Sequence, residues 1–525
     1  MADAGAVDEL RERDALEDAA RLVVDPDPHL LQDAVALAVI GVLRQDDLRT
    51  FDRGDDVGER DLVGRTRQHV TATHAALGAH EPRALDRQQD LLEVRLREMG
   101  ALGDLLHGGR TIHCVQRERQ QRPGRVIAAR RHPHATIVAR KKVGASPRPG
   151  STLRPMTSSL VGAVRPALDG ASIAGLVPAL LGVRDAAWLP EPAREAEAVV
   201  LLVLDGLGWN ALGDHADEMP ELAAMAGGPI TTVLPATTAS ALTSITTGLA
   251  PAQHGILGYR MLVGQEVLNV LRWSVQGGGR APDPFDVQRH TAFLGRAVPV
   301  VTKVEFRGSG FTQAHLRGGR FVGWHTTAAL VEHCLVEIEA GERLVYAYYP
   351  GVDSVAHEFG LHARVFRREL AAADALVAAL LDALPARAAL LVTADHGQVH
   401  LERESWIAVP ELAAMTTAMA GDGRFRYLYA RKGAARELLA AAREQVGPQA
   451  WVWSRAEVLD EGLLGTGATG SVPGRIGDVV LAARDAVAFV DPALPNEVQL
   501  HSGHGSLTPD EMLVPLVAAH GRAPN

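Results

Sequence analysis

Several apolar runs in this chain are followed within a few residues by aspartate or histidine, and this arrangement constrains the fold more than any other feature of the sequence. The runs, with the side chains that follow them, are 199–204 with Asp205, 344–349 with Asp353 and His357, and 389–393 with Asp395 and His396. A short, continuous apolar run is typical of a strand that is buried on both faces of a sheet. Polar residues that follow such strands lie at the carboxyl edge of the sheet, where open α/β sheets bind their ligands.

From residue 156 onward, strand-like runs alternate with helical patterns. The predicted strands are 199–204, 229–234, 298–304, 344–349, 389–393, 478–483 and 486–490, and the clearest predicted helices are 239–247, 327–339, 365–384 and 434–445. This alternation predicts an α/β fold whose largely parallel central sheet is covered by helices on both faces. Stretches rich in glycine and proline at 276–284 and 462–475 predict loops or inserted lobes between core elements.

The length and composition limit the class of protein. A chain of 525 residues exceeds one ordinary domain, and its hydrophobic content of 47% is ample for a large core. The net charge of −10 argues against a nucleic-acid-binding protein, although bound metals can still attract phosphate locally. The apolar runs stay well below the roughly 20 residues that a membrane-spanning helix needs.

The sequence favours a cytoplasmic location. Cys114 and Cys334 are the only cysteines, so the chain cannot have a disulfide framework, and this suits a reducing compartment. The first residues lack the basic and apolar regions of a signal peptide. We therefore expect the protein in the cytoplasm.

Residues 1–155 differ in composition from the rest of the chain. They contain no Trp, Tyr or Asn, Phe51 is their only aromatic residue, and Lys occurs only at Lys141 and Lys142. A segment of this kind has little material for a firm core, so one interpretation is a partly helical, poorly ordered extension. The other is that the segment is not natural coding sequence, because a GC-rich gene read in an unselected frame would give such a composition. We favour the second interpretation, in which the working protein begins at Met156.

The aspartates and histidines that follow the apolar runs have the spacing of metal ligands. Asp353 and His357 are four residues apart, which puts them on one side of a helical turn. Gly397 permits the bend that lets the adjacent Asp395 and His396 reach one cation. Each residue alone is equally well explained as a turn cap or a surface contact, so the prediction depends on the set. Together, three aspartates and three histidines would hold two divalent cations, an arrangement suited to displacement at phosphorus: Asp205, Asp353, His357, Asp395, His396 and His504.

Thr238 is the candidate nucleophile. It opens a helical run that ends near Thr247, and a hydroxyl at a helix N-terminus lies beside free backbone N–H groups that favour an approaching phosphate. A metal ion in contact with the hydroxyl oxygen would lower its pKa and make an alkoxide available. Threonine is also a common N-cap residue, so the nearby cation ligands carry this interpretation.

The segment 156–525 resembles the alkaline phosphatase superfamily, and most closely its type I phosphodiesterase / nucleotide pyrophosphatase branch. The order and spacing of several motifs over some three hundred residues carry the resemblance. These motifs are Val203-Leu204-Asp205-Gly206, the threonine-containing helix start leading to Thr247-Gly248 and His254-Gly255, Asp353-x-x-x-His357, Asp395-His396-Gly397, and His504-Gly505. The resemblance implies an alkaline phosphatase-like three-layer sandwich with a largely parallel central sheet and inserted cap segments, at about 260–325 and 400–475.

The resemblance also implies a ligand set and a reaction. Asp353, His357 and His504 would hold one zinc ion. Asp205, Asp395 and His396 would hold the second, which would also contact Thr238. Thr238 would displace the leaving alcohol in line and form a phospho-threonine, which water would then hydrolyse. The implied substrate is a small phosphate ester, with nucleotides among the candidates.

The chain departs from the family pattern at one position. In the phosphodiesterase branch an asparagine follows the His-Gly motif and donates a hydrogen bond to the phosphoryl oxygen, whereas Gly258 and Tyr259 occupy that place here. The hydroxyl of Tyr259 is therefore the candidate donor. Four aromatic residues are candidates for an apolar wall against a nucleobase or an aryl leaving group: Trp273, Trp324, Tyr348 and Tyr349. Ordinary core packing is the better explanation for at least half of them.

Three functions follow from these observations. The leading hypothesis is a metal-dependent hydrolase that cleaves phosphodiester or pyrophosphate bonds. The second keeps the same chemistry but with a phosphomonoester or phosphonate as substrate. The third is a metal-binding homologue without catalytic activity, which the joint presence of both ligand sets and Thr238 disfavours.

Overall fold

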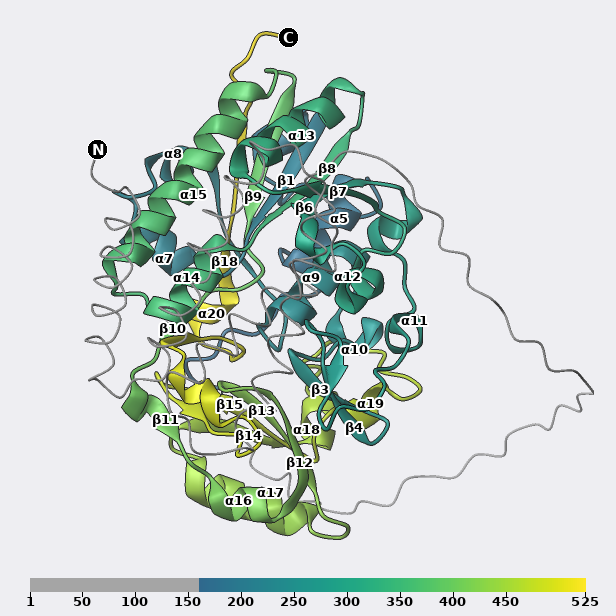
Figure 1. Cartoon of the computed structure of the whole chain (residues 1–525), viewed down its shortest axis with the longest axis vertical. Coiled ribbons are helices and arrows are strands. Elements are labelled where there is room, and N and C mark those ends of the chain that lie inside the picture. Colours follow the sequence, from purple (N-terminus) through teal and green to yellow (C-terminus); the bar gives the residue numbers. More distant parts are fainter. Residues whose placement is uncertain (1–159) are drawn as a thin grey trace, which may run out of the picture. The chain divides into compact units, whose positions relative to one another are not determined.

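The structure is a computed structural model that describes residues 160–525, and Figure 1 shows its elements. The expectations for residues 1–155 lie outside these described residues. The main element is a seven-stranded sheet with the strand order β2-β18-β9-β1-β8-β6-β7. Its strands are β1 (Ala198–Leu204), β2 (Ala226–Thr231), β6 (Pro299–Lys303), β7 (Arg320–Trp324), β8 (Leu344–Tyr349), β9 (Ala388–Thr393) and β18 (Leu513–His520).

The central sheet is largely parallel, as predicted. Strand β1 pairs in parallel with β8 and β9, and β6 pairs in parallel with β7 and β8. Only β18 differs within this sheet, because it runs antiparallel to both of its neighbours, β2 and β9. Every residue of β1 and β9 is buried. The continuous apolar runs of the sequence are therefore strands that are buried on both faces.

Two groups of helices lie on either side of the central sheet (Figure 1). One group packs around α15 (Arg364–Ala383) and contains α8 (Pro220–Ala224), α7 (Trp209–Asp214), α13 (Thr327–Glu339) and α14 (Gly351–Phe359). The other packs around α9 (Thr238–Thr247) and contains α5 (Ile173–Leu180), α10 (Pro251–His254) and α12 (Gly310–His315). The arrangement is a three-layer α/β sandwich.

The segment that follows β9 forms a second sheet with its own hydrophobic core. This antiparallel sheet has the order β12-β13-β15-β14, with β12 (Thr416–Asp422), β13 (Phe425–Ala430), β14 (Ala450–Ser454) and β15 (Val479–Ala483). Three helices accompany it: α16 (Pro410–Ala414), α17 (Ala435–Val446) and α18 (Arg455–Asp460). Valines and leucines from α17, β14 and β15 fill its core. The predicted strand at 478–483 thus belongs to this second sheet and not to the central one.

The segment expected as a lobe at about 260–325 is divided between two sheets. Its first part forms a separate three-stranded sheet of β3 (Arg260–Val263), β4 (Glu266–Asn269) and β5 (Ser274–Val275). Its last part supplies β6 and β7 to the central sheet. The predicted lobe therefore extends too far along the chain, because the two strands that follow the small sheet belong to the central sheet.

Two short ribbons and several short helices complete the fold. The ribbons are β10 (Val399–His400) with β17 (Ser502–Gly503), and β11 (Trp406–Ile407) with β16 (Ala488–Phe489). The remaining helices are α6 (Glu191–Glu195), α11 (Pro284–Val287), α19 (Val472–Arg475) and α20 (Pro509–Met512), with single 3₁₀ turns at Ala292–Gly295, Val304–Phe306, Arg403–Ser405 and Pro495–Gln499. Within residues 160–525, no helix combines the length and the apolar character that crossing a membrane requires.

Candidate metal centre and active site

The fold brings side chains from five distant segments to the carboxyl ends of the central strands. Each segment follows or begins an element whose position is fixed by core packing. Asp205 follows β1, Thr238 begins α9, Asp353 and His357 lie on α14 just after β8, Asp395 and His396 follow β9, and His504 follows β17. Backbone hydrogen bonds tie two of these segments together, since the N–H of Asp205 donates to Tyr349 and the N–H of Asp353 donates to Asp205.

Asp205 and Asp395 are buried, and each keeps one carboxylate oxygen without a hydrogen-bond partner. The backbone N–H groups of Gly206 and His396 donate to Asp395 Oδ1 at 3.1 and 3.0 Å. The hydroxyl of Tyr348 donates to Asp205 Oδ2. The other two oxygens, Asp205 Oδ1 and Asp395 Oδ2, are buried without a partner. Unpaired buried oxygens are costly unless a cation takes the place of the missing donor.

The three histidines are oriented in the same way. In each, the ring Nδ1 lies at hydrogen-bond distance from a backbone carbonyl: His357 from Ser502 at 3.0 Å, His396 from Gly397 at 3.1 Å and His504 from Ala236 at 2.9 Å. A carbonyl only accepts, so Nδ1 carries the proton and donates. The lone pair on Nε2 is then left to bind a metal, which is how metal-binding histidines are commonly held.

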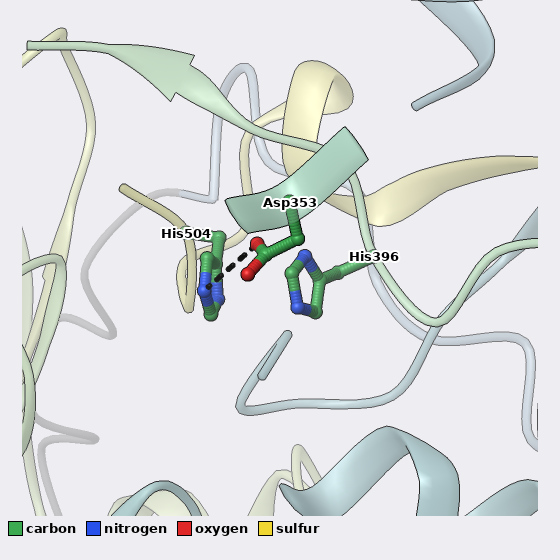
Figure 2. A group of neighbouring side chains, drawn as sticks. All are labelled: Asp353, His396 and His504. Carbon is green, nitrogen blue, oxygen red and sulfur yellow. Dashed lines mark ion pairs between the residues drawn. The ribbon is translucent and has the colours of Figure 1, made fainter. Parts of the chain in front are cut away.

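Carboxylate oxygens and Nε2 atoms of these residues form two neighbouring groups. The ligating atoms of Asp353, His396 and His504 lie within 4.8 Å of one another, as do those of Asp205, Asp395 and His396. Figure 2 shows the first group, in which the carboxylate of Asp353 lies beside the two imidazole rings and His504 Nε2 is 3.9 Å from Asp353 Oδ1. In the second group, His396 Nε2 lies 3.6 Å from Asp205 Oδ1 and 3.4 Å from Asp395 Oδ2.

His357 and His396 have a different relation to these groups than the sequence suggested. His357 stands outside both, although its Nε2 lies 3.4 Å from Asp353 Oδ1 and its ring centroid 5.2 Å from that of His504. His396 belongs to both groups, because its ring stacks on that of His504 with centroids 3.7 Å apart. All six predicted ligands nevertheless lie together at one edge of the sheet.

Thr238 lies beside this cluster. Its Oγ1 is 3.1 Å from His396 Nε2, and the residue is 8% exposed. As the first residue of α9 it lies at the end of the helix where the first backbone N–H groups lack helical partners. The buried Oγ1 of Thr237 also has no partner among the described residues. Phosphate oxygens suit such a group of donors.

The electrostatics of the cluster also favour a cation. Burial, together with repulsion from Asp395 and Asp353, holds the pKa of Asp205 well above its usual range. Burial is also the largest reason that the pKa of Asp395 is raised. Burial and two neighbouring histidines lower the pKa of His504 well below its usual value, which keeps the ring neutral and able to bind a metal. The donor set of carboxylates and neutral imidazoles is the set that zinc prefers.

The other residues singled out in the sequence lie in different settings. Tyr259 precedes β3, and its hydroxyl accepts a hydrogen bond from Asn269 Nδ2 at 2.7 Å. His254 is buried and accepts from the N–H of Ile256 through Nδ1, and burial lowers its pKa to about 3, so it is a neutral core residue. Trp324 is buried and stacks on Tyr349 with centroids 6.2 Å apart.

Three contributors to the cluster were not predicted from the sequence. Tyr348 supports Asp205 through its hydroxyl, whereas the sequence suggested it for an apolar wall. Gln398 donates to Asp353 Oδ1 at 2.9 Å, and Ser502 donates to Gln398 Oε1 at 2.5 Å. Gln398 directly follows the Asp395-His396-Gly397 motif, and this position is the one sequence feature that could have marked it as part of the site. Nothing in the sequence marks Ser502, because the pairing of β10 with β17 brings it there.

Several comparisons place the chain among known proteins. The chain is similar to the solved structures of the murine ectonucleotide pyrophosphatase / phosphodiesterase 5 (15% identity, TM-score 0.48) and of its human counterpart (15%, 0.45). It is also similar to an inactive threonine-to-alanine variant of the murine protein in complex with AMP (14%, 0.48). Each alignment covers 62% of this chain and 88% of the other.

No curated protein sequence shows significant similarity to the chain. The family model described as type I phosphodiesterase / nucleotide pyrophosphatase, in contrast, matches residues 199–507. This match spans more than half of the chain and includes every predicted site residue. The chain therefore belongs to the type I phosphodiesterase / nucleotide pyrophosphatase family of the alkaline phosphatase superfamily.

Proposed function

We propose that the protein hydrolyses phosphodiester or pyrophosphate bonds with the help of two divalent cations, with zinc as the expected metal. One observation carries the proposal: two unpartnered buried carboxylate oxygens and the Nε2 atoms of His396 and His504 gather beside the hydroxyl of Thr238. Family membership supports the hydrolase class. The cluster supports the metal requirement, because without a cation its carboxylates repel one another.

Each cation would have its own ligands. Asp353, His357 and His504 would hold one, and Asp205, Asp395 and His396 the other. When bound, the cations would neutralise the non-bridging oxygens of the substrate and favour the ionised form of the Thr238 hydroxyl. His396 lies in both groups of ligating atoms. Small shifts of its ring would therefore decide which cation it contacts.

Thr238 is the proposed nucleophile. Its oxygen would form a bond to phosphorus while the leaving oxygen departs in line with the bonding electrons, giving a phospho-threonine. The N-terminus of α9 would stabilise the phosphate through its free N–H groups. Water would then attack the phosphorus and regenerate the threonine. We expect small phosphate esters as substrates and nucleotides as the first class to test.

The test is an assay of the full chain at saturating zinc with bis-p-nitrophenyl phosphate, a diester, and p-nitrophenyl phosphate, a monoester. We expect faster turnover of the diester. Thr238→Ala should lower the diester rate at least about 10³-fold, since the nucleophile is lost, while two zinc ions remain bound. Thr243→Ala, in the same helix, is the matched control, because Thr243 Oγ1 only donates to the carbonyl of Ala239. Unchanged activity in Thr238→Ala would show that Thr238 is not the nucleophile.

A phosphomonoesterase or phosphonate hydrolase is the second candidate function. The observation that favours it is Tyr259, which stands where the phosphodiesterase branch has asparagine. Its hydroxyl accepts from Asn269 Nδ2, so the phenolic proton is left to donate to another group. Faster turnover of the monoester, or of a phosphonate, would replace the diester proposal with this one. A chain that binds zinc but turns over none of these substrates would instead be a non-catalytic homologue.

A further inference from the structure

We infer that Gln398 and Ser502 are positioning residues that hold the ligands of one of the two proposed cation sites in place. The inference rests on the proposed function, because it concerns the site of Asp353, His357 and His504. Neither residue is a proposed ligand or contacts Thr238. Both are buried, and they come from opposite strands of one short ribbon, since Gln398 immediately precedes β10 and Ser502 begins β17.

Ser502 is connected to one ligand directly and to a second one through Gln398. Its backbone carbonyl accepts from Nδ1 of His357 at 3.0 Å and so fixes the protonated nitrogen of that ring. Its hydroxyl donates to Gln398 Oε1 at 2.5 Å. This second bond fixes which end of the Gln398 amide faces Asp353, because the amide oxygen is already occupied. The next residue but one, His504, is itself a proposed ligand.

Gln398 completes the connection at the carboxylate. Its Nε2 donates to Asp353 Oδ1 at 2.9 Å, and this is the oxygen nearest the Nε2 atoms of His357 and His504. The amide fits only because Gly206 lies beneath it. A Cβ at Gly206 would be 2.4 Å from Gln398 Nε2 and 2.9 Å from the Cβ of Asp353. The first segment after β1 is thus shaped to admit this hydrogen bond.

An amide is chemically suited to this position. A carboxylate oxygen has two lone pairs, so Asp353 Oδ1 can accept from the amide and still bind a cation. A cationic side chain in place of Gln398 would repel the metal, and an anionic one would repel Asp353. The neutral donor fixes the direction of the oxygen without changing the charge of the site. Supporting hydrogen bonds of this kind raise metal affinity by holding ligands in their binding geometry.

The experiment is a zinc titration of the full chain against a chromophoric chelator, which reports affinity without catalysis. The wild-type chain should bind two zinc ions. Gln398→Leu should weaken one of the two by about 10–100-fold and leave the other unchanged. In a chain that also carries Asp395→Asn, which disrupts the other site, the same loss should appear at the site that remains. Gln288→Leu is the control, since Gln288 is also buried but bonds only with the backbone of His290 and Ala314.

Ser502→Ala provides a second variant, which keeps the carbonyl that accepts from His357 and removes both hydroxyl contacts, the one to Gln398 Oε1 and the longer one of 3.4 Å to His357 Nδ1. It should weaken the binding of the same zinc ion, and most of this loss should be absent when Gln398→Leu is already present, because the shorter contact of the hydroxyl is the one to the Gln398 amide. Two results would overturn this inference and leave the proposed function standing. One is a double variant whose loss of zinc affinity is the sum of the two single losses. The other is an unchanged zinc affinity in both single variants, in a chain that binds two zinc ions. A wild-type chain that binds fewer than two zinc ions would overturn the proposed function itself.

Discussion

Tyr346 and Tyr348 lie two residues apart on β8 and therefore point to the same face of the sheet, but their hydroxyls differ. The hydroxyl of Tyr348 donates to Asp205 Oδ2, whereas the buried hydroxyl of Tyr346 has no partner among the described residues. Both side chains are nearly fully buried. Removing each hydroxyl in turn therefore compares the loss of a hydrogen-bonded hydroxyl with the loss of an unpaired one.

Tyr348→Phe should lower the free energy of unfolding by about 1–3 kcal/mol, because a buried carboxylate oxygen loses its donor. Tyr346→Phe should be neutral or stabilising, because it removes an unpaired polar group. Urea denaturation of both variants with zinc present measures the difference. Equal effects in the two variants would show that the Tyr348 hydrogen bond does not support Asp205.

Asp422, at the end of β12, gives a pH-dependent prediction. Burial, and secondly Glu497, raise its pKa from 3.8 to about 7, so the folded protein keeps the carboxyl protonated where the unfolded chain has already ionised. The stability that this group contributes is fully present below pH 3.8 and is lost as the pH rises to about 7. Between pH 5 and 7 the loss is about 2–3 kcal/mol, at 1.36 kcal/mol per unit.

The Asp422→Asn variant cannot ionise at this position, so its stability should fall less than that of the wild type between pH 5 and 7. Urea denaturation of both proteins at pH 5 and pH 7 measures how much free energy of unfolding each one loses. Asp214→Asn, at an exposed position, is the control and should follow the wild type. Parallel pH profiles for Asp422→Asn and the wild type would contradict the assignment.

The elements that local pattern determines were well predicted from the sequence. Helix α13 has the predicted bounds, Thr327–Glu339, because Thr326 caps it by accepting from the N–H of Ala329. Strands β1, β8 and β9 are likewise close to their apolar runs. The edge strand β2 was predicted at 229–234 but spans Ala226–Thr231, since its pairing with β18 sets its extent. Such pairing depends on residues nearly three hundred positions away.

Which sheet a strand joins was not predictable from its own residues. The run 478–483 is as apolar as the core strands, but it pairs with β13 and β14 in the second sheet. The proposed ligands were predictable because chemistry and motif order mark aspartate and histidine. Gln398 and Ser502 were not, because an amide and a hydroxyl acquire their role only through the contacts that the fold creates.

Helix α9, which presents Thr238, ends at a glycine that the packing requires. Gly248 has φ +71°, and a Cβ there would lie 2.5 Å from Pro178 of helix α5. Gly433 has a similar φ of +84° but open space around it. Gly433→Ala should therefore show only the backbone strain, about 1–2 kcal/mol, and Gly248→Ala should cost a further 1–3 kcal/mol, roughly, from the clash. Thermal unfolding measures both, and equal losses would show that α5 yields freely.

At the scale of the whole molecule, the two proposed cations connect segments that lie far apart in the sequence. Their proposed ligands come from helix α14 and from the segments that follow β1, β9 and β17, which together span residues 205–504. Opening any one of these segments would separate the ligands. Metal binding should therefore stabilise the folded chain as a unit, by mass action.

Removing the metal should destabilise the protein, and more so at higher pH. In the metal-free folded state the pKa values of Asp205 and Asp395 are raised, so the stability they contribute is present at low pH and declines as the pH rises above their unfolded value of 3.8. Zinc reverses this decline because it binds the ionised carboxylates, and protons compete with it less as the pH rises.

The difference in unfolding temperature between zinc-loaded and chelator-treated protein should therefore widen from pH 5 to pH 8. Zinc at a hundred times its dissociation constant should contribute about 2.7 kcal/mol per site. Differential scanning calorimetry of both forms at several pH values measures the effect, and Asp205→Asn should narrow the difference because it removes one of the two titrating carboxylates. A constant difference across this range would mean that zinc binds elsewhere on the chain, since the buried carboxylate pair could not then be its ligands.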